Sequence, residues 1–420
     1  MTTTTLRYDN LLSDLISFGV KPEEIKRAQE SFVKATEKPL QAPLYSFWEV
    51  LDPVTGDSTS LKQLMPFNVA LALAYKKSGV EIEPDKLRMP KKPIWVTLKG
   101  ESEYLRHIPD FNSGYRPEPS HANKIIDLVM RKNGIGNGRG FYGYGEAGTG
   151  KTSMALWFAA VIGQPVVQFN CSSTTETEDL FLRQISINGV WKTVDSALLT
   201  ACKRGYWAIV DELDLAPASL PPSLNDLIEG HSYSVAGLKE AVKANDQFRL
   251  LAFGNTGLNC SERGNYNGRN VIDESTLSRF VIDKFENLSE NKIKSMILGS
   301  YPEVGEFAEM TAKFFSCVEN DFAANNISSV VSPRNILDFV EIFKANENEM
   351  EQPLVYAASI KLPIINDDDS ARESVLTQLT IHFRTLCPES DIEKLWKDRN
   401  KFKCDGSSSD DEDIFASLNL

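Results

Sequence analysis

Short apolar stretches alternate with longer segments of helical periodicity from Ala122 onward. Runs of roughly four to eight residues rich in valine, isoleucine and aromatic side chains are typical of buried strands, whereas apolar residues at every third or fourth position are typical of helices. Strands that alternate with helices favour a parallel sheet covered on both faces. We therefore predict an α/β domain at 111–288, with strands at 141–144, 165–170, 206–211, 248–255 and 280–285.

The preceding segment, 1–110, has a different pattern and predicts a small α+β docking module followed by a linker. Its turns are marked by proline and glycine, and its apolar residues switch between helical and alternating spacing. The expected elements are two short helices within 8–36, two strands within 44–64, a helix at 67–79, and a proline-rich linker at 81–119 that contains one strand, "PIWVTLKG".

The pattern after the sheet is helical and predicts a lid at 289–362. Residues 363–420 predict a helical extension and then an acidic tail. The tail, "CDGSSSDDEDIFASLNL", joins a Ser/Asp/Glu run to a short apolar end, a composition typical of disorder. Such a tail either keeps a protein soluble or docks its apolar residues in a partner's groove.

The sequence "GEAGTGKTS" joins the first predicted strand of the sheet to a largely apolar helix at 152–161. It fits G-x-x-x-x-G-K-[ST], in which glycine conformations let successive backbone N–H groups surround a phosphate. The positive end of the helix dipole would face the same phosphate. Lys151 would reach the β- and γ-phosphates of a nucleotide, and Thr152 would bind Mg²⁺. The phosphate-reading residues do not distinguish ATP from GTP. The predicted nucleotide-binding residues are Gly145, Glu146, Ala147, Gly148, Thr149, Gly150, Lys151, Thr152, Ser153 and, from the next motif, Asp211.

Two adjacent acids, Asp211 and Glu212, follow the apolar strand "YWAIV". Parallel sheets bind ligands at the carboxyl ends of their strands, so both acids are expected beside the phosphates. Asp211 would hold Mg²⁺ together with Thr152, and Glu212 would polarise the attacking water. Asn255, at the end of the strand 248–255, would orient the same water. This arrangement predicts hydrolysis in addition to binding.

Two arginines are further catalytic candidates. Arg279 ends a short helix in "DESTLSRFVID", where it could act as an arginine finger on the nucleotide of a neighbouring subunit. Arg334 lies in the first turn of a helix that begins at "SPRN". A cation at a helix N-terminus opposes the dipole, which indicates a phosphate partner.

Composition and charge narrow the class of protein. The chain of 420 residues has 42% hydrophobic and 25% charged residues, which is typical of a soluble globular protein, and we expect a cytoplasmic location and no membrane partner. The net charge of −13 argues against a surface that coats nucleic acid. The six cysteines contain no C-x-x-C pair, so the sequence indicates neither a disulfide framework nor a zinc knuckle.

Together, the P-loop, "VDELD", Asn255, "STLSRF" and "SPRN" resemble an AAA+ ATPase over roughly 120–360. The segment "DELDLAPASLPPSLNDLIEG" is similar to the dynein-related, MoxR-like branch, which includes midasin and the ATPase subunit of cobaltochelatase. The resemblance implies a P-loop NTPase fold and ATP hydrolysis between the subunits of a ring, usually hexameric. It also implies mechanical work on a protein partner, in several relatives one with a von Willebrand A-type domain.

Two insertions are similar to those of this branch. A hairpin around Asn188 and Gly189, within 180–205, faces the central pore in similar proteins, which makes Val190 and Trp191 candidates for gripping a substrate. A second hairpin is expected within 232–246. The sequence departs from the family at Asp214, where many relatives have asparagine, and at Ser278, where aspartate is frequent.

The favoured hypothesis is a ring-forming ATPase that remodels a protein partner. One alternative is the ATPase subunit of a metal chelatase that inserts Co²⁺ into a corrin ring. Another is a nucleic-acid-associated motor with residues 1–110 as its recognition module, for which the acidic composition gives no support.

Overall fold

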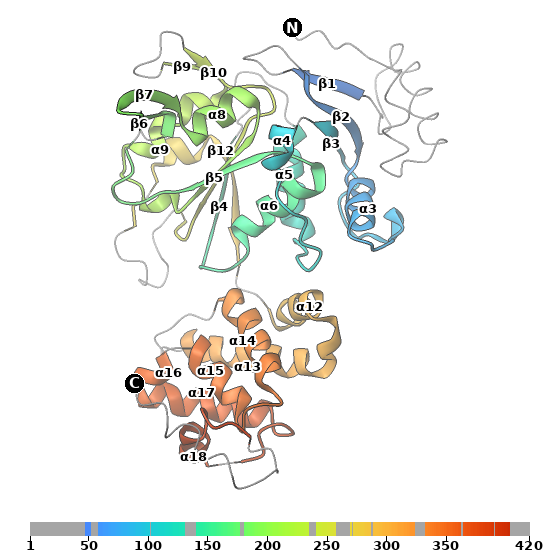
Figure 1. Cartoon of the computed structure of the whole chain (residues 1–420), viewed down its shortest axis with the longest axis vertical. Helices are drawn as coiled ribbons and strands as arrows, with labels where there is room; N and C mark the ends of the chain where they lie inside the picture. Colours follow the sequence, from blue (N-terminus) through green and yellow to red (C-terminus); the bar gives the residue numbers. More distant parts are fainter. Residues whose placement is uncertain are drawn as a thin grey trace. The chain divides into compact units, whose positions relative to one another are not determined.

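The computed structural model describes most of the chain and divides it into two compact units, Met1–Asn287 and Leu288–Leu420 (Figure 1). The helices expected within 8–36 and the acidic tail lie outside the described residues. The residues that the structure describes are 47–51, 58–100, 102–130, 140–176, 180–234, 241–257, 269–270, 272–286, 289–323, 332–362, 364–389 and 391–403.

The first unit is built around a five-stranded sheet, and the predicted α/β fold is confirmed. Every pair of neighbouring strands is parallel, as expected for strands connected by helical crossovers. All five predicted strands are present, and no end differs by more than one residue. Their order across the sheet is β12 (Phe280–Phe285), β4 (Gly140–Gly145), β11 (Arg249–Gly254), β8 (Trp207–Asp211) and β5 (Val166–Asn170).

Helix α6 (Lys151–Ile162) follows β4 directly and is apolar on all sides. A helix of this kind must be covered on all sides. The helix α3 (Phe67–Lys77) packs against it, with the ring of Phe67 stacked on Phe158 at 4.9 Å between centroids. Two further helices contact the strands of the sheet: α5 (Pro119–Met130) contacts β12 and β4, and α8 (Ala197–Arg204) contacts β5 and β8.

An antiparallel sheet precedes the parallel one. The sequence predicted its three strands but placed the third in a linker, whereas the structure pairs it with the second. Its strands are β1 (Phe47–Leu51), β2 (Ser58–Pro66) and β3 (Pro93–Gly100), with β2 in the centre. Apolar residues of α3, β2 and β3 belong to the same hydrophobic core as α6 and β4. The segment before residue 110 therefore supports the helix that starts at the P-loop. Short helices connect these elements: η1 (Pro84–Lys86) and α4 (Ser102–Arg106).

Both predicted hairpins are present. The first pairs β6 (Leu182–Ile187) with β7 (Val190–Asp195), and its turn residues Asn188 and Gly189 have φ of 54° and 75°. Positive φ at both turn positions is the geometry that favours Asn-Gly. The second hairpin is much shorter, with β9 (Ser232–Tyr233) paired to β10 (Val242–Lys243).

The second unit is helical, as predicted, and the helices after residue 361 share its core. Stacked and tilted phenylalanine rings form the centre, among them Phe307, Phe343 and Phe383. Its elements are α12 (Glu290–Ser300), η3 (Pro302–Val304), α13 (Gly305–Ala323), α14 (Pro333–Asn346), α15 (Pro353–Lys361), α16 (Ile364–Asp367), α17 (Asp369–His382) and α18 (Ile392–Lys397). Among the described residues of both units, no helix is sufficiently long and apolar to span a bilayer.

Lys62 of β2 is unusually buried for a lysine, because it is only 2% exposed. Its ammonium donates to Gln164 Oε1 at 3.0 Å and to Gln247 Oε1 at 3.2 Å, which links β2 to the segments that precede β5 and β11. Burial, together with the nearby charge of Arg249, lowers the pKa of Lys62 to about 7. Neutralising a buried lysine is the usual response to desolvation.

This pKa predicts a pH-dependent stability. Between pH 7 and the ordinary lysine pKa, the folded protein binds fewer protons than the unfolded chain, so stability should increase as the pH rises through this interval. We expect the melting temperature to rise less between pH 7 and pH 9.5 in Lys62→Met than in the wild type. Lys86→Met, at an exposed lysine of η1, is the control and should follow the wild type. Equal slopes in all three proteins would contradict the burial argument.

Candidate active site

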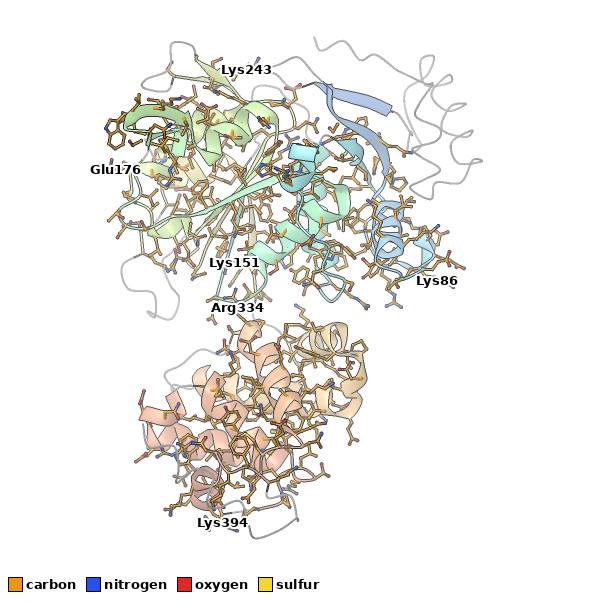
Figure 2. All side chains as sticks on the ribbon, in the orientation of Figure 1. Lys86, Lys151, Glu176, Lys243, Arg334 and Lys394 are labelled. Atoms are coloured by element: carbon orange, nitrogen blue, oxygen red, sulfur yellow. The ribbon has the colours of Figure 1, made fainter. Side chains whose placement is uncertain are left out.

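The P-loop connects β4 to α6, and its glycines adopt conformations that other residues avoid. Gly145, Gly148 and Gly150 have φ of 149°, 80° and 85°. A Cβ atom on Gly145 would lie 2.2 Å from the carbonyl oxygen of Phe285, so no other residue fits there. Lys151 begins the helix at the end of this loop (Figure 2). The backbone at the start of α6 therefore has the geometry expected of the predicted phosphate-binding loop.

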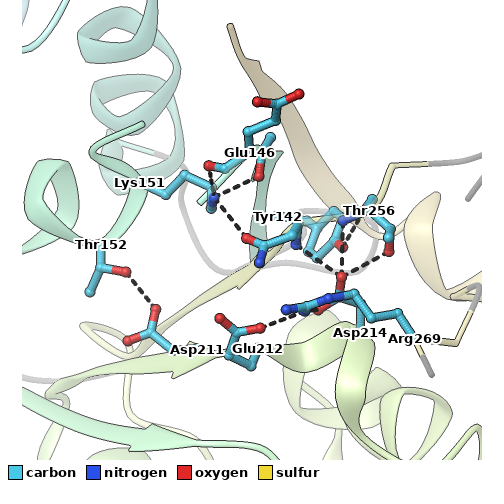
Figure 3. A network of polar contacts seen from close by, with 11 residues as sticks. Tyr142, Glu146, Lys151, Thr152, Asp211, Glu212, Asp214, Thr256 and Arg269 are labelled. Carbon is cyan, nitrogen blue, oxygen red and sulfur yellow. Dashed lines mark hydrogen bonds and ion pairs between the residues drawn. The ribbon is translucent and has the colours of Figure 1, made fainter. Parts of the chain in front are cut away.

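The Lys151 ammonium joins the P-loop to the neighbouring strand end. It donates to the carbonyl oxygens of Gly145 and Glu146, both at 2.7 Å, and to Asn255 Oδ1 at 3.0 Å (Figure 3). Burial lowers the pKa of Lys151 to about 8, although the carboxylates of Glu212 and Asp214 oppose this shift. A phosphate would compete with the loop carbonyls for the same protons.

A hydrogen bond between Thr152 and Asp211 connects the start of α6 to the end of β8. The Thr152 hydroxyl donates to Asp211 Oδ1 at 2.6 Å, and Gln168 Nε2 donates to Asp211 Oδ2 at 2.7 Å. A hydroxyl and a carboxylate side by side are hard oxygen ligands of the kind that Mg²⁺ prefers. These two side chains fit the predicted Mg²⁺ site.

Glu212 follows Asp211, the last residue of β8, and lies in the turn after the strand. Its φ of 58° is in the left-handed region, which is costly for a residue with a Cβ and is concentrated at functional sites. Its Oε2 forms an ion pair with Arg269 Nη1 at 2.5 Å (Figure 3). Glu212, the base candidate, is therefore constrained by the left-handed conformation of its backbone and by the ion pair of its carboxylate with Arg269.

Asp214 is the buried centre of this network, with 0% exposure. Its Oδ2 accepts from the backbone N–H groups of Asn255 and Thr256, both at 2.9 Å, and from the Thr256 hydroxyl at 2.8 Å. Its Oδ1 pairs with Arg269 Nη1 at 2.5 Å. Asp214 thus links the turn that follows β8 to the end of β11.

Arg279 lies away from the P-loop. It precedes Phe280, which pairs with Gly140 at the amino end of β4, whereas the P-loop starts at the carboxyl end of that strand. Five residues of extended strand separate the two positions by about 16 Å. The Arg279 guanidinium donates to Glu229 Oε1 at 2.8 Å and to the carbonyl oxygen of Ser275.

The other predicted residues lie outside this network. Arg334 is exposed in the first turn of α14, two residues after the N-cap Ser332, and belongs to the second unit (Figure 2). Val190 and Trp191, at the start of β7, are 60% and 70% exposed. Large apolar side chains with such exposure are typical of contact surfaces.

Three described residues of the network were not identified from the sequence. Gln168 is a polar residue inside the apolar strand β5, which is a usable signal. Thr256 follows Asn255 directly but looks like an ordinary turn residue. Arg269 lies in a Gly/Tyr/Asn-rich segment far from Glu212 along the chain, and no local pattern indicates their contact.

Comparison with known proteins agrees with this geometry. Residues 144–280, which run from the end of β4 to the start of β12, match the AAA domain family of the dynein-related subfamily. Over these residues the chain is similar to the dynein-related AAA domains. The match supports nucleotide binding and ATPase activity in general, on the P-loop fold that the structure shows.

The AAA domain has relatives in very different contexts. The chain is 27% identical over 157 residues to midasin of Giardia intestinalis and 26% identical over 155 residues to midasin of Dictyostelium discoideum. These matches cover 37% and 36% of the chain but only 3% and 2% of the midasins. An uncharacterized protein of Staphylococcus aureus is 27% identical over 159 residues, which cover 36% of the chain and 57% of that protein.

The pKa of Lys151 predicts how ATP affinity depends on pH. Below pH 8 the amine is protonated and binds phosphate, whereas above pH 8 binding must first supply the missing proton. We expect the Kd for ATP to rise above pH 8, approaching about tenfold per pH unit. Isothermal titration between pH 7 and pH 9.5 measures this.

The matched control is Lys151→Arg, which stays charged over this interval. This variant should bind more weakly at pH 7, because the fork of the guanidinium differs from an ammonium, but its Kd should vary little with pH. Parallel pH profiles for the wild type and Lys151→Arg would show that another group governs the dependence.

Proposed function

We propose that the protein is a ring-forming AAA+ ATPase that couples Mg²⁺-dependent ATP hydrolysis to the remodelling of a protein partner. The observation that carries this proposal is the convergence of Lys151, Asn255, Thr152 and Asp211 at one edge of the sheet, with Glu212 in the adjoining ion pair. Binding, metal-ligating and water-activating groups are then within one site.

Each residue has a role in the proposed reaction. The P-loop amides and Lys151 hold the phosphates, and Thr152 and Asp211 hold the Mg²⁺ ion, which would neutralise phosphate charge. Glu212 accepts a hydrogen bond from the attacking water and polarises it. Asn255, whose amide oxygen already contacts Lys151, orients this water beside the γ-phosphate.

The position of Arg279 supports action on a neighbouring subunit. A side chain at the amino end of β12 cannot reach the phosphates bound at the carboxyl end of β4 in its own subunit, because about 16 Å of strand lies between them. Head-to-tail contacts in a closed ring, for which we propose six subunits, would bring Arg279 of one subunit to the nucleotide of the next. Arg334 is proposed as a second phosphate-contacting arginine.

The proposed partner is a protein. Trp191 and Val190 offer an exposed apolar contact at the β6–β7 hairpin, which we propose faces the pore and grips the partner. We further propose that this partner has a von Willebrand A-type domain and that the ATPase acts in the cytoplasm. The metal-chelatase alternative has one group of metal-ligating side chains among the described residues, Asp226, Glu229 and His231, but Glu229 already pairs with Arg279.

Mixing two inactive variants tests the ring. Glu212→Gln lacks the water-polarising carboxylate and Arg279→Ala lacks the proposed finger, so each alone should lose at least about 99% of the ATPase rate. In an equimolar mixed ring, a site is complete when an Arg279→Ala subunit is followed by a Glu212→Gln subunit. We therefore expect the mixture to recover about a quarter of the wild-type rate per site.

The measurement is phosphate release together with native mass determination, so that subunit exchange is verified. A mixture that is no more active than its two components would place Arg279 outside the neighbour's site. A monomer that hydrolyses ATP at the full rate would overturn the ring.

A further inference from the structure

Glu212, the candidate base, forms an ion pair with Arg269, a residue that has no role in the proposed reaction. Arg269 Nη1 lies 2.5 Å from Glu212 Oε2 and 2.5 Å from Asp214 Oδ1. The same nitrogen therefore bridges a carboxylate that is 37% exposed and one with no exposure.

Asp214 makes a firm anchor for this bridge. Its carboxylate accepts three hydrogen bonds from Asn255 and Thr256, and it is fully buried. A buried charge is tolerated only when it is paired and hydrogen-bonded, so Asp214 requires the positive charge of Arg269. Although burial opposes the charge of Arg269, the two carboxylates outweigh this effect and raise its pKa.

The backbone next to Arg269 is also anchored. Asn270 donates its N–H to the carbonyl oxygen of Asp214 at 2.7 Å, and its side-chain amide donates to the carbonyl oxygen of Ala216 at 2.7 Å. These bonds attach Asn270 to η2 (Leu213–Leu215), which immediately follows Glu212. The Arg269 side chain is 11% exposed, so little of it faces solvent.

We propose that Arg269 is a positioning residue for ATP hydrolysis, which holds the Glu212 carboxylate in place against the buried Asp214. The inference rests on the proposed function, because it concerns the orientation of the group that polarises the water. Arg269 itself contacts no phosphate in this account. Its effect belongs to the chemical step, since a small displacement of a catalytic group is costly while nucleotide binding uses other residues.

The test compares Arg269→Ala and Arg269→Lys with the full-length wild-type protein, using phosphate release for kcat and isothermal titration for the Kd of ATP. We expect kcat to fall by about 10- to 100-fold in Arg269→Ala, with a Kd within about threefold of the wild type. Arg269→Lys retains the charge that Asp214 needs and should lose less, so this variant carries the test if the alanine variant unfolds.

Two controls separate positioning from a structural role. Guanidinium ion added to Arg269→Ala should restore part of kcat, but it should not raise the rate of Glu212→Gln, which lacks the carboxylate to be positioned. Adding Arg269→Ala to Glu212→Gln should have little further effect on kcat, because the two residues act in one step. Arg384→Ala, at an exposed arginine of the second unit, should match the wild type.

Each contrary result is distinct. Unchanged or increased kcat in Arg269→Ala, or a loss of affinity as large as the loss of kcat, would overturn the positioning role. Undetectable hydrolysis by the wild-type protein would instead overturn the proposed function.

Discussion

The parallel pairing of β4, β11 and β8 is the constraint on which the site depends. Tyr144 pairs with Gly254, and the register between β11 and β8 brings their carboxyl ends to the same edge. At this edge lie the P-loop, Asn255, and Asp211 with Glu212. Their side chains meet because the strands are parallel and in register, although they are far apart along the chain.

Two sets of interactions keep this edge rigid. Behind the P-loop, α3 packs against the apolar helix α6, which carries Lys151 and Thr152 and shares its core. Beside the P-loop, the buried Asp214 ties the end of β11 to the turn after β8. A site that polarises water needs such fixed groups, because reorganisation during the reaction costs rate.

The fold of the parallel sheet and the P-loop could be predicted because both depend on local patterns, apolar runs and glycine spacing. Asp211, Glu212 and Asn255 could be predicted as neighbours because parallel strands place their carboxyl ends together. Arg269 could not, since its contact with Glu212 is set by a long segment without periodicity. The packing of α3 on α6 could not be predicted either. The apolar sequence of α6 indicates that the helix is buried, but it does not indicate which element covers it.

A structure of the Glu212→Gln variant with Mg²⁺ and ATP tests the central claim most directly. We expect the Lys151 ammonium to turn from the Gly145 and Glu146 carbonyls to the phosphates. Thr152 and Asp211 should lie at the Mg²⁺ ion, and Asn255 should lie beside the γ-phosphate. An ATP molecule bound elsewhere, or phosphates that leave the Lys151 contacts with the loop intact, would contradict this claim.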